Sequence, residues 1–189
     1  SMTASTPETW IRLDQAQLGV AIARHTRFRR GTANGARANL AFHDLSGLSL
    51  AGADLSGADL TGALLKGIDG RGINLGDAVL YGADLRLANL DHADLSYADL
   101  RGVCFRGAKL RGTRLNEADI REAVLARYDR RRSLDPELRE VRPDFSSVDA
   151  RGVDLSNARF GQAYVVQADF TDAVLCGVNL RGADLRNTD

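Results

Sequence analysis

The sequence predicts an all-β solenoid, and three observations carry this prediction. Leucine or a close substitute stands at nearly every fifth position in one phase, from Leu40 to Leu125 and again from Phe145 to Leu185. Alanine often lies two positions before it, and glycine often lies two positions after it. A period of five fits neither the 3.6-residue repeat of a helix nor the two-residue repeat of a simple strand. A unit this short buries its apolar side chains only by stacking on neighbouring units, which is how a solenoid is built.

The unit Ala58-Asp59-Leu60-Thr61-Gly62 shows how one face would form. Ala58 and Leu60 are two residues apart, so an extended segment points both side chains inward. Gly62 supplies the freedom to turn a corner. Successive coils should then hydrogen-bond to each other at the ordinary strand separation of about 4.8 Å.

The A-(D/N)-L-x-G pattern resembles that of the pentapeptide-repeat proteins over roughly residues 38–125 and 145–189. This resemblance implies a right-handed quadrilateral parallel β-helix with four units per coil, which the spacing alone does not distinguish from three. Residues 20 apart would then stack, and Gly70 would leave a small void or a bulge in one column. The residues that we expect in the core are Leu40, Leu45, Leu60, Leu65, Leu80, Leu85, Leu100, Phe105, Ile120, Leu125, Phe145, Phe160 and Phe170.

Residues 1–37 lack the repeat and are expected to form an N-terminal capping helix. Thr6 and Pro7 suit a helix start, and Gly31 suits its end. Leu13, Leu18, Ile22 and His25 follow at helical spacing. The cap would cover the otherwise unpaired end of the β-helix. The alternative is that the basic cluster Arg24, Arg27, Arg29 and Arg30 binds an acidic partner or nucleic acid.

Residues 126–144 interrupt the repeat and contain many arginines, among them Arg130, Arg131 and Arg132, which are candidates for binding a partner. Two arrangements are open: the segment replaces one coil, so that Phe145 stacks over Leu125, or it projects as a loop, so that Phe145 begins the next face. We favour the projecting loop, because so many arginines do not fit a coil interior. A short helix over 136–141, stopped by Pro143, is expected within it.

Composition restricts the biochemical possibilities. The 25 basic and 25 acidic residues give a net charge of zero, so overall charge favours neither nucleic acid nor a membrane surface. No apolar stretch is long enough to span a bilayer, and no secretion signal is visible. Two cysteines far apart in sequence, Cys104 and Cys176, favour a reducing cytoplasm over a disulfide framework.

The sequence offers no candidate catalytic, cofactor-binding or metal-binding residues. His25, His43 and His92 show no paired-ligand spacing, and no phosphate-binding glycine motif is present. The aspartates before the central leucines belong to the repeat and are interpreted as structural. We therefore expect a protein that is not an enzyme and has no cofactor.

One face is predicted to bind a partner, because basic and apolar residues occur together on it. Lys66, Arg86 and Arg106 would form a basic column, with Leu64 and Leu87 beside it and Tyr164 on this face or the next. The predicted function is a non-catalytic structural or protein-interaction module. The alternative, suggested by the family resemblance, is a DNA mimic that binds DNA gyrase or topoisomerase IV. A homodimer through the C-terminal coil is also expected, because no capping helix follows Leu185.

Overall fold

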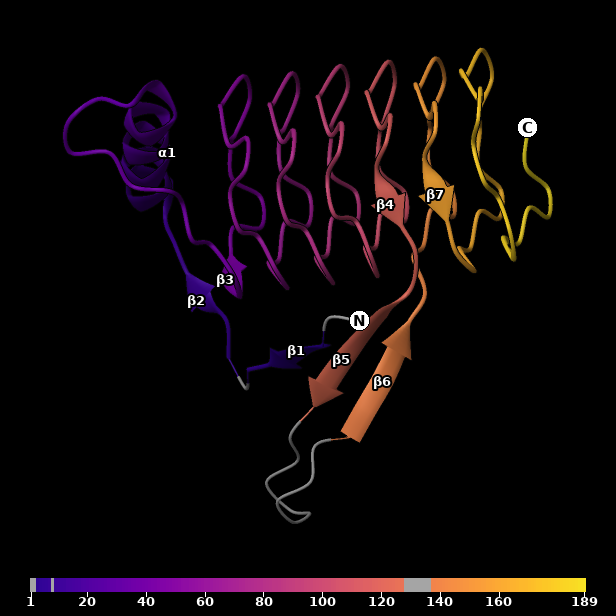
Figure 1. The fold of residues 1–189 in the computed structure, drawn as a ribbon, viewed down its shortest axis with the longest axis horizontal. Helices are drawn as coiled ribbons and strands as arrows, with labels where there is room; N and C mark the ends of the chain where they lie inside the picture. Colours follow the sequence, from indigo (N-terminus) through magenta and orange to yellow (C-terminus); the bar gives the residue numbers. More distant parts are fainter. Residues whose placement is uncertain (1–2, 8, 128–136) are drawn as a thin grey trace.

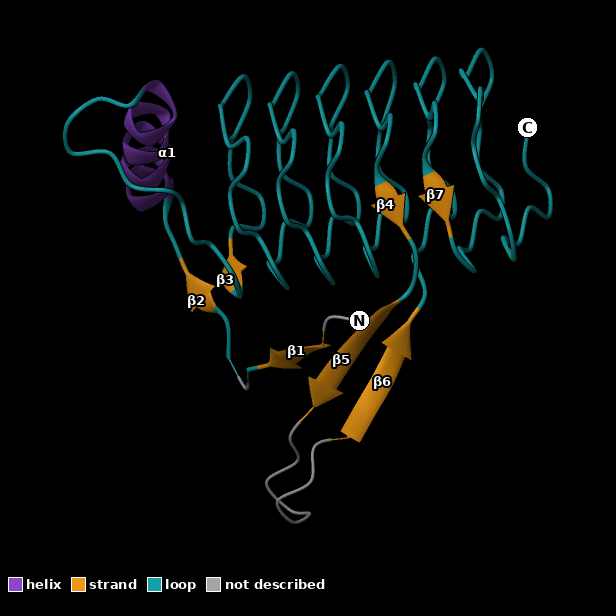
Figure 2. Ribbon diagram, viewed as in Figure 1, coloured by secondary structure: helices purple, strands orange, loops and turns teal. Residues whose placement is uncertain are grey.

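The computed structural model describes residues 3–7, 9–127 and 137–189. Stacked coils form a β-helix that runs from the helix α1 at one end to the C-terminus at the other, as Figure 1 shows. The regular elements are α1 (Gln15–Arg30) and the strands β1 (Thr3–Thr6), β2 (Ile11–Arg12), β3 (His43–Asp44), β4 (Asp119–Ile120), β5 (Ala123–Arg127), β6 (Glu137–Val141) and β7 (Arg159–Phe160). Most of the solenoid is drawn as loop in Figure 2, because each face pairs through single-residue bridges.

Parallel bridges connect residues 20 apart, so each coil has four faces of five residues. One column of bridges runs through Asn39, Asp59, Val79, Asp99 and Asp119, and three similar columns begin at Asp44, Ser49 and Asp54. The backbone N–H of Leu60 donates to Val79 O at 2.7 Å, and the same bond repeats along the stack. The polar backbone is therefore satisfied between coils rather than within them.

The corners are β-turns whose third residue has a left-handed backbone. At one corner the N–H of Ala63 donates to Leu60 O at 3.0 Å, and Gly62 has a φ of 62°. This geometry is typical of turns that need a positive φ, where glycine has no steric penalty. Leu87 and Tyr97 adopt the same conformation with φ of 60°.

The interior is a narrow apolar column of large and small side chains. Leu40, Leu45, Leu60, Leu65, Leu80, Leu85, Leu100, Phe105, Ile120, Phe145 and Phe160 are all buried, as the repeat predicts. Phe145 packs between Phe105 and Phe160, with ring centroids 4.9 and 5.3 Å apart. Burying each large side chain of this kind contributes about 1.5–3 kcal/mol.

Three core expectations differ from the structure. Leu125 is only partly buried and lies in β5, because the chain leaves the coil after Ile120. Phe170 is partly buried, since it lies near the open end of the stack. Gly70 leaves no void: a Cβ placed there would lie 2.8 Å from Leu90 Cδ2 and 3.3 Å from Ile68 Cδ1, so these neighbours fill the space.

The helix α1 lies across the first coil and begins later than the sequence suggested. Asp14 is its N-cap and forms a capping box with Gln17, whereas Thr6 lies in β1. The helix ends at Gly31, as expected, with a φ of 68°. Leu18 and His25 are its buried residues, and they face the coil.

The chain before α1 runs along the solenoid as an extended arm. The Trp10 Nε1–H donates to Gly62 O at 2.7 Å, and β2 pairs in parallel with β3 of the first coil. β1 pairs in parallel with β5. These pairings with distant residues explain why the segment before Asp14 is extended rather than helical.

β5 and β6 leave the solenoid as the two antiparallel strands of a β-hairpin rather than replacing a coil. Asp144 pairs with Cys104 and Arg159 with Asp119, so these partners are 40 residues apart in sequence instead of 20. The extra 20 residues are the insertion, and the other 20 form one coil. Phe145 therefore stacks beside Phe105 and not over Leu125. The helix expected over 136–141 is wrong for its described part, because β6 occupies residues 137–141 and pairs antiparallel with β5. Together β1, β5 and β6 form a three-stranded sheet below the solenoid (Figure 1).

Candidate interaction surfaces

The aspartates of the repeat stabilise the corners and leave little free carboxylate. Asp59 Oδ1 accepts hydrogen bonds from the Thr61 backbone N at 3.0 Å and from its hydroxyl at 2.7 Å. Where arginine follows instead, it forms a two-pronged ion pair, as between Arg71 and Asp69 with contacts of 2.9 and 2.8 Å. The side-chain and backbone hydrogen bonds from Arg71 hold the pKa of Asp69 below its usual range. The structural interpretation of these aspartates agrees with this geometry.

The predicted basic column exists in position but is largely neutralised. Arg86 Nη2 lies 2.7 Å from Asp84 Oδ2, and Arg106 Nη2 lies 2.7 Å from Asp144 Oδ2 of the next coil. Lys66 is exposed and makes no ion pair within the described part of the chain. This column therefore presents one uncompensated charge rather than three.

The apolar residues predicted beside this column differ in accessibility. Leu87 has 61% of its surface exposed, while Leu64 is only partly exposed. Tyr164 is 38% exposed, and the Arg142 guanidinium stacks 3.8 Å from its ring centroid. The structure thus joins Tyr164 to the base of the hairpin. Arg130, Arg131 and Arg132 lie outside the described residues.

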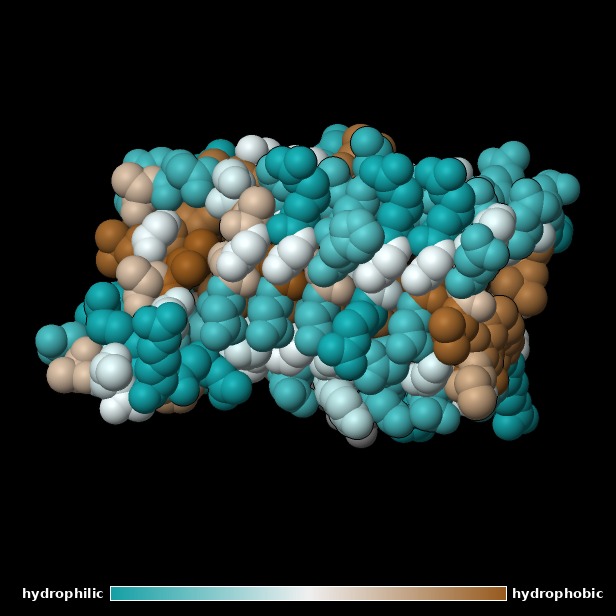
Figure 3. Space-filling model, turned by 90° about the horizontal axis from the view of Figure 1, so that it is seen from above, coloured by the Kyte–Doolittle hydropathy of each residue, from teal (hydrophilic) through white to brown (hydrophobic). Residues whose placement is uncertain are grey.

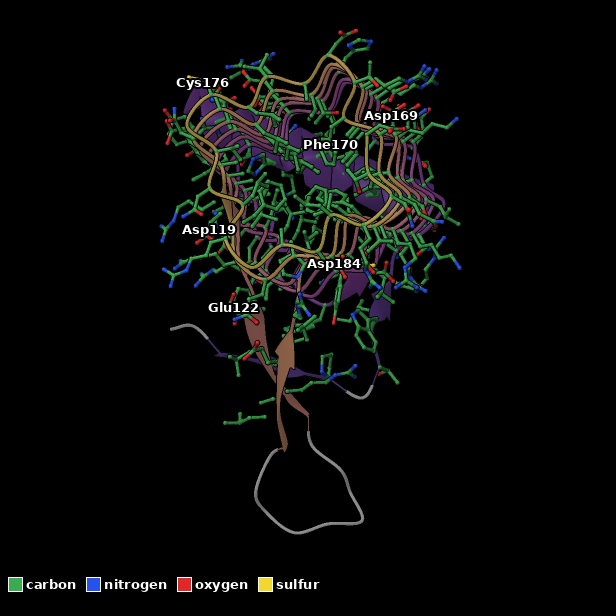
Figure 4. The ribbon with its side chains drawn as sticks, turned by 90° about the vertical axis from the view of Figure 1, so that its right-hand side faces the viewer. Asp119, Glu122, Asp169, Phe170, Cys176 and Asp184 are labelled. Carbon is green, nitrogen blue, oxygen red and sulfur yellow. The ribbon has the colours of Figure 1, made fainter. Side chains whose placement is uncertain are left out.

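The last coil leaves inward-facing side chains open to solvent. Leu175 and Leu185 are 44% and 45% exposed, although the same repeat positions are buried in the middle of the stack. They line a hollow of about 230 Å³ together with Phe170 and Leu180. Figure 4 looks onto this end, with Phe170 inside the ring of the last coils, and Figure 3 shows hydrophobic surface at the same end.

The base of the hairpin carries a second hollow, which the sequence reasoning missed. It has a volume of about 300 Å³ and is lined by Arg121, Glu122, Arg159, Phe160, Gly161, Gln162, Asn179, Arg181 and Gly182. Arg121 is paired with Asp119 at 2.7 Å. Burial opposes ionisation of Asp119, but the hydrogen bond from Arg121 and the nearby charges of Arg121, Arg101 and Arg159 keep its pKa below the usual value.

A signal for this hollow was present in the repeat itself. The column position held by Asp59, Asp99 and Asp119 becomes Arg159 and then Asn179 in the last two coils. In the last two coils this position therefore holds no carboxylate, and Arg181 lies two residues after Asn179. The column assignment after residue 145 depended on how the hairpin was inserted, which the sequence did not decide.

The described residues contain no group of three or more His, Cys, Asp or Glu side chains placed to hold a metal ion. Cys104 and Cys176 are free, and burial raises the pKa of the Cys104 thiol. No helix in the described ranges is long and apolar enough to cross a membrane.

A family model described as pentapeptide repeats matches eight copies, over residues 36–67, 71–107, 104–127 and 154–189. These matches cover well over half of the chain. They continue to residue 127, although the coil ends at residue 120. No curated protein sequence matches the chain significantly.

Several solved structures resemble this one. HetL, a pentapeptide repeat protein involved in heterocyst differentiation regulation from the cyanobacterium Nostoc sp. strain PCC 7120, is 24% identical, covers 93% of this chain and 96% of its own, and has a TM-score of 0.27. Full-length QnrB1, a plasmid-mediated fluoroquinolone resistance protein, is 13% identical, with coverage of 100% and 92% and a TM-score of 0.31. A pentapeptide repeat protein from the thylakoid lumen of Arabidopsis thaliana is 26% identical, with coverage of 77% and 67% and a TM-score of 0.29.

Proposed function

This chain belongs to the pentapeptide-repeat family, whose fold is a right-handed β-helix, and we propose that it acts as a non-catalytic protein-interaction module. The observation that carries the proposal is the open C-terminal coil. Leu175 and Leu185 occupy inward positions of the repeat, yet nearly half of each is exposed. In this arrangement α1 caps one end of the solenoid, and the hairpin and the opposite end remain available for contacts. The two free cysteines suit a reducing compartment such as the cytoplasm.

The partner that fits the open coil best is a second copy of this chain. A second β-helix end presents the same leucines and the same unpaired backbone groups, so two copies joined about a two-fold axis would cover both. Burial of four large apolar side chains from each copy would contribute several kcal/mol, at about 25 cal/mol per Å² of apolar surface removed from water.

Sedimentation velocity tests this assignment. The wild-type chain should sediment as a dimer at micromolar concentration, and Leu175→Lys with Leu185→Lys should shift it to the monomer. Leu138→Lys is the matched control, because Leu138 is 64% exposed but lies on the hairpin. A wild-type monomer, or an equal shift in the control, would refute the C-terminal interface.

The face with Lys66, Leu87 and Tyr164 is a second proposed contact surface, for a different protein partner. It combines an uncompensated cation with two exposed apolar side chains, which suits the centre of an interface better than solvent. Partners captured by the wild type should be lost with Lys66→Glu combined with Leu87→Glu, and retained with the double change Arg71→Glu and Arg151→Glu at another corner.

The DNA-mimic alternative has less support. Such a mimic needs a continuous acidic stripe, but each bridge column mixes aspartate with other residues, for example Asp94 followed by Arg114 and Asp154. Arginines also neutralise many of the aspartates, as Arg151 does Asp149 at 2.8 Å. A gyrase supercoiling assay showing inhibition or drug protection would restore this alternative.

A further inference from the structure

We propose that the hollow at the base of the hairpin binds a phosphate monoester. We name this hollow, lined by Arg121, Glu122, Arg159, Gly161, Gln162, Asn179 and Arg181, the hairpin-base site. It lies on the side of the solenoid where Figure 4 labels Asp119 and Glu122, directly above the point where β5 leaves the coil. It is separate from the open C-terminal coil.

The first argument is charge balance. At several other corners arginine follows an aspartate two residues earlier and bonds to it, as in Asp69–Arg71, Asp84–Arg86 and Asp149–Arg151. Arg159 and Arg181 form no ion pair within the described ranges, and the residues two positions before them are Asn157 and Asn179 rather than aspartate. Asp119, on which the charge of Arg159 acts, and Glu122 are the nearby carboxylates, so the three arginines Arg121, Arg159 and Arg181 leave this hollow with an excess of one positive charge.

The second argument is the supply of donors. Arg121, Arg159 and Arg181 line the hollow from three successive coils, and Arg121 also bonds to Asp119. The side-chain amides of Gln162 and Asn179 add neutral donors. Guanidinium groups form their strongest hydrogen bonds with phosphate and carboxylate oxygens. A phosphate monoester offers three such oxygens and a charge of about −1.5 to −2 at pH 7, and the excess positive charge of the hollow attracts it.

The third argument is space. Gly161 has no side chain, and a Cβ there would lie 2.8 Å from Glu122 Oε2 and 3.0 Å from Arg121 Cγ. The side chains of Glu122 and Arg121 therefore lie directly over the backbone of Gly161, which leaves room for them because it has no side chain. Glu122 and Asp119 are the carboxylates facing this region, and Asp119 is already bonded to Arg121. Glu122 is thus the group that competes with an incoming anion.

Isothermal titration calorimetry on the full chain at physiological ionic strength tests the proposal, with O-phosphoserine as the probe. The wild type should bind it saturably, and Arg159→Ala with Arg181→Ala should weaken binding about tenfold or more, because each lost charged hydrogen bond is worth about a factor of ten. Glu122→Gln should tighten binding severalfold, since it removes the competing carboxylate. If the double variant does not fold, Arg181→Gln alone should still weaken binding.

The matched control is Arg71→Ala with Arg151→Ala, which removes the same charge from another corner and should leave the affinity within about twofold, as expected for screened distant charges. A phosphorylated peptide with neutral flanks separates the two sources of a monoester. Binding much tighter than that of O-phosphoserine indicates a protein ligand, and equal binding indicates a small metabolite. Absence of saturable binding by the wild type, equal weakening in the control, or no gain from Glu122→Gln would overturn the proposal.

Discussion

The buried imidazole of His25 joins α1 to the first coil. Its Nδ1 accepts a hydrogen bond from the Ala38 backbone N–H at 2.9 Å, and its Nε2–H donates to Ser56 O at 2.7 Å. Both ring nitrogens are used by main-chain groups at the edge of the stack, where no preceding coil is present to bond them. One side chain thus replaces part of a missing coil.

Replacing His25 with Phe should destabilise the N-terminal end of the solenoid. The ring volume is kept, but a buried N–H and a buried C=O lose their partners, at a cost of about 1–3 kcal/mol for each. The urea midpoint should fall, and amide exchange should accelerate in α1 and the first coil. His92→Phe, at an exposed corner, should leave both unchanged. An unchanged midpoint for His25→Phe would contradict the proposed role.

The hairpin is held against the corners of two coils by specific contacts. The Tyr81 hydroxyl donates to Val124 O at 3.1 Å and accepts from Val124 N at 2.7 Å. Leu125 rests on Gly82, and Ala123 rests on Gly102. The element is therefore docked along the solenoid, with glycine corners supplying room for its close approach.

Tyr81→Phe should loosen the hairpin without unfolding the coils. The change removes one hydroxyl that satisfies both polar groups of Val124, so the Val124 amide should exchange faster by about tenfold, as loss of a hydrogen bond of about 1 kcal/mol or more implies. Hydrogen exchange measured by NMR checks this. Tyr97→Phe is the control, because Tyr97 is 60% exposed. Equal protection of Val124 in the wild type and Tyr81→Phe would contradict the docking role.

Gly102→Ala should displace the hairpin more than Gly52→Ala does. Both glycines have a φ near 66°, so both variants carry about 1 kcal/mol or more of left-handed strain. Only at Gly102 would the new methyl lie 2.4 Å from Ala123 Cβ, whereas nothing lies within 4 Å at Gly52. Limited proteolysis should therefore cut the hairpin faster in Gly102→Ala. Similar cleavage rates in the two variants would show that this contact does not hold the hairpin.

Across the whole molecule, ion pairs and corner hydrogen bonds bind the carboxylates of the repeat. The Ser46 backbone N–H lowers the pKa of Asp44, although burial partly opposes it. Arg71, Arg151 and Arg186 lower the pKa values of Asp69, Asp149 and Asp184 chiefly through side-chain hydrogen bonds. The stability of the stack therefore depends on the ionised form of many aspartates, each of which contributes a small amount.

Stability should fall in acid. An unfolded aspartate has a pKa of about 3.9, and these folded pKa values are lower, so the stabilisation is complete above that pH and is lost as the pH falls through the folded values. The melting temperature should be nearly constant between about pH 7 and pH 5 and should decrease below about pH 4. Asp69→Asn with Asp149→Asn should flatten this decrease. A decrease of the same slope in that variant would exclude these pairs as the cause.

The repeat predicted the interior because each inward position is set by local geometry. Side chains alternate in an extended segment, and the chain turns every five residues. Together these two features place Leu60 and Leu100 inside, independently of the more distant parts of the chain. The same logic failed at Leu125, which keeps the phase but lies in β5. The five-residue spacing continues across the insertion because the insertion is 20 residues long. Spacing alone therefore does not distinguish a coil from a hairpin.

The sequence by itself determined the β-helix, its inward residues and the structural role of its aspartates, because these depend on neighbours within five residues. Only the tertiary structure decided the extended arm before α1, the hairpin and its docking by Tyr81, and the hollow between Arg159 and Arg181. The arm depends on pairing with the first coils and with β5, and the hairpin and the hollow depend on which coils lie side by side after residue 120. That adjacency is set by long-range pairing, such as Cys104 with Asp144, for which the repeat carries no unique local signal.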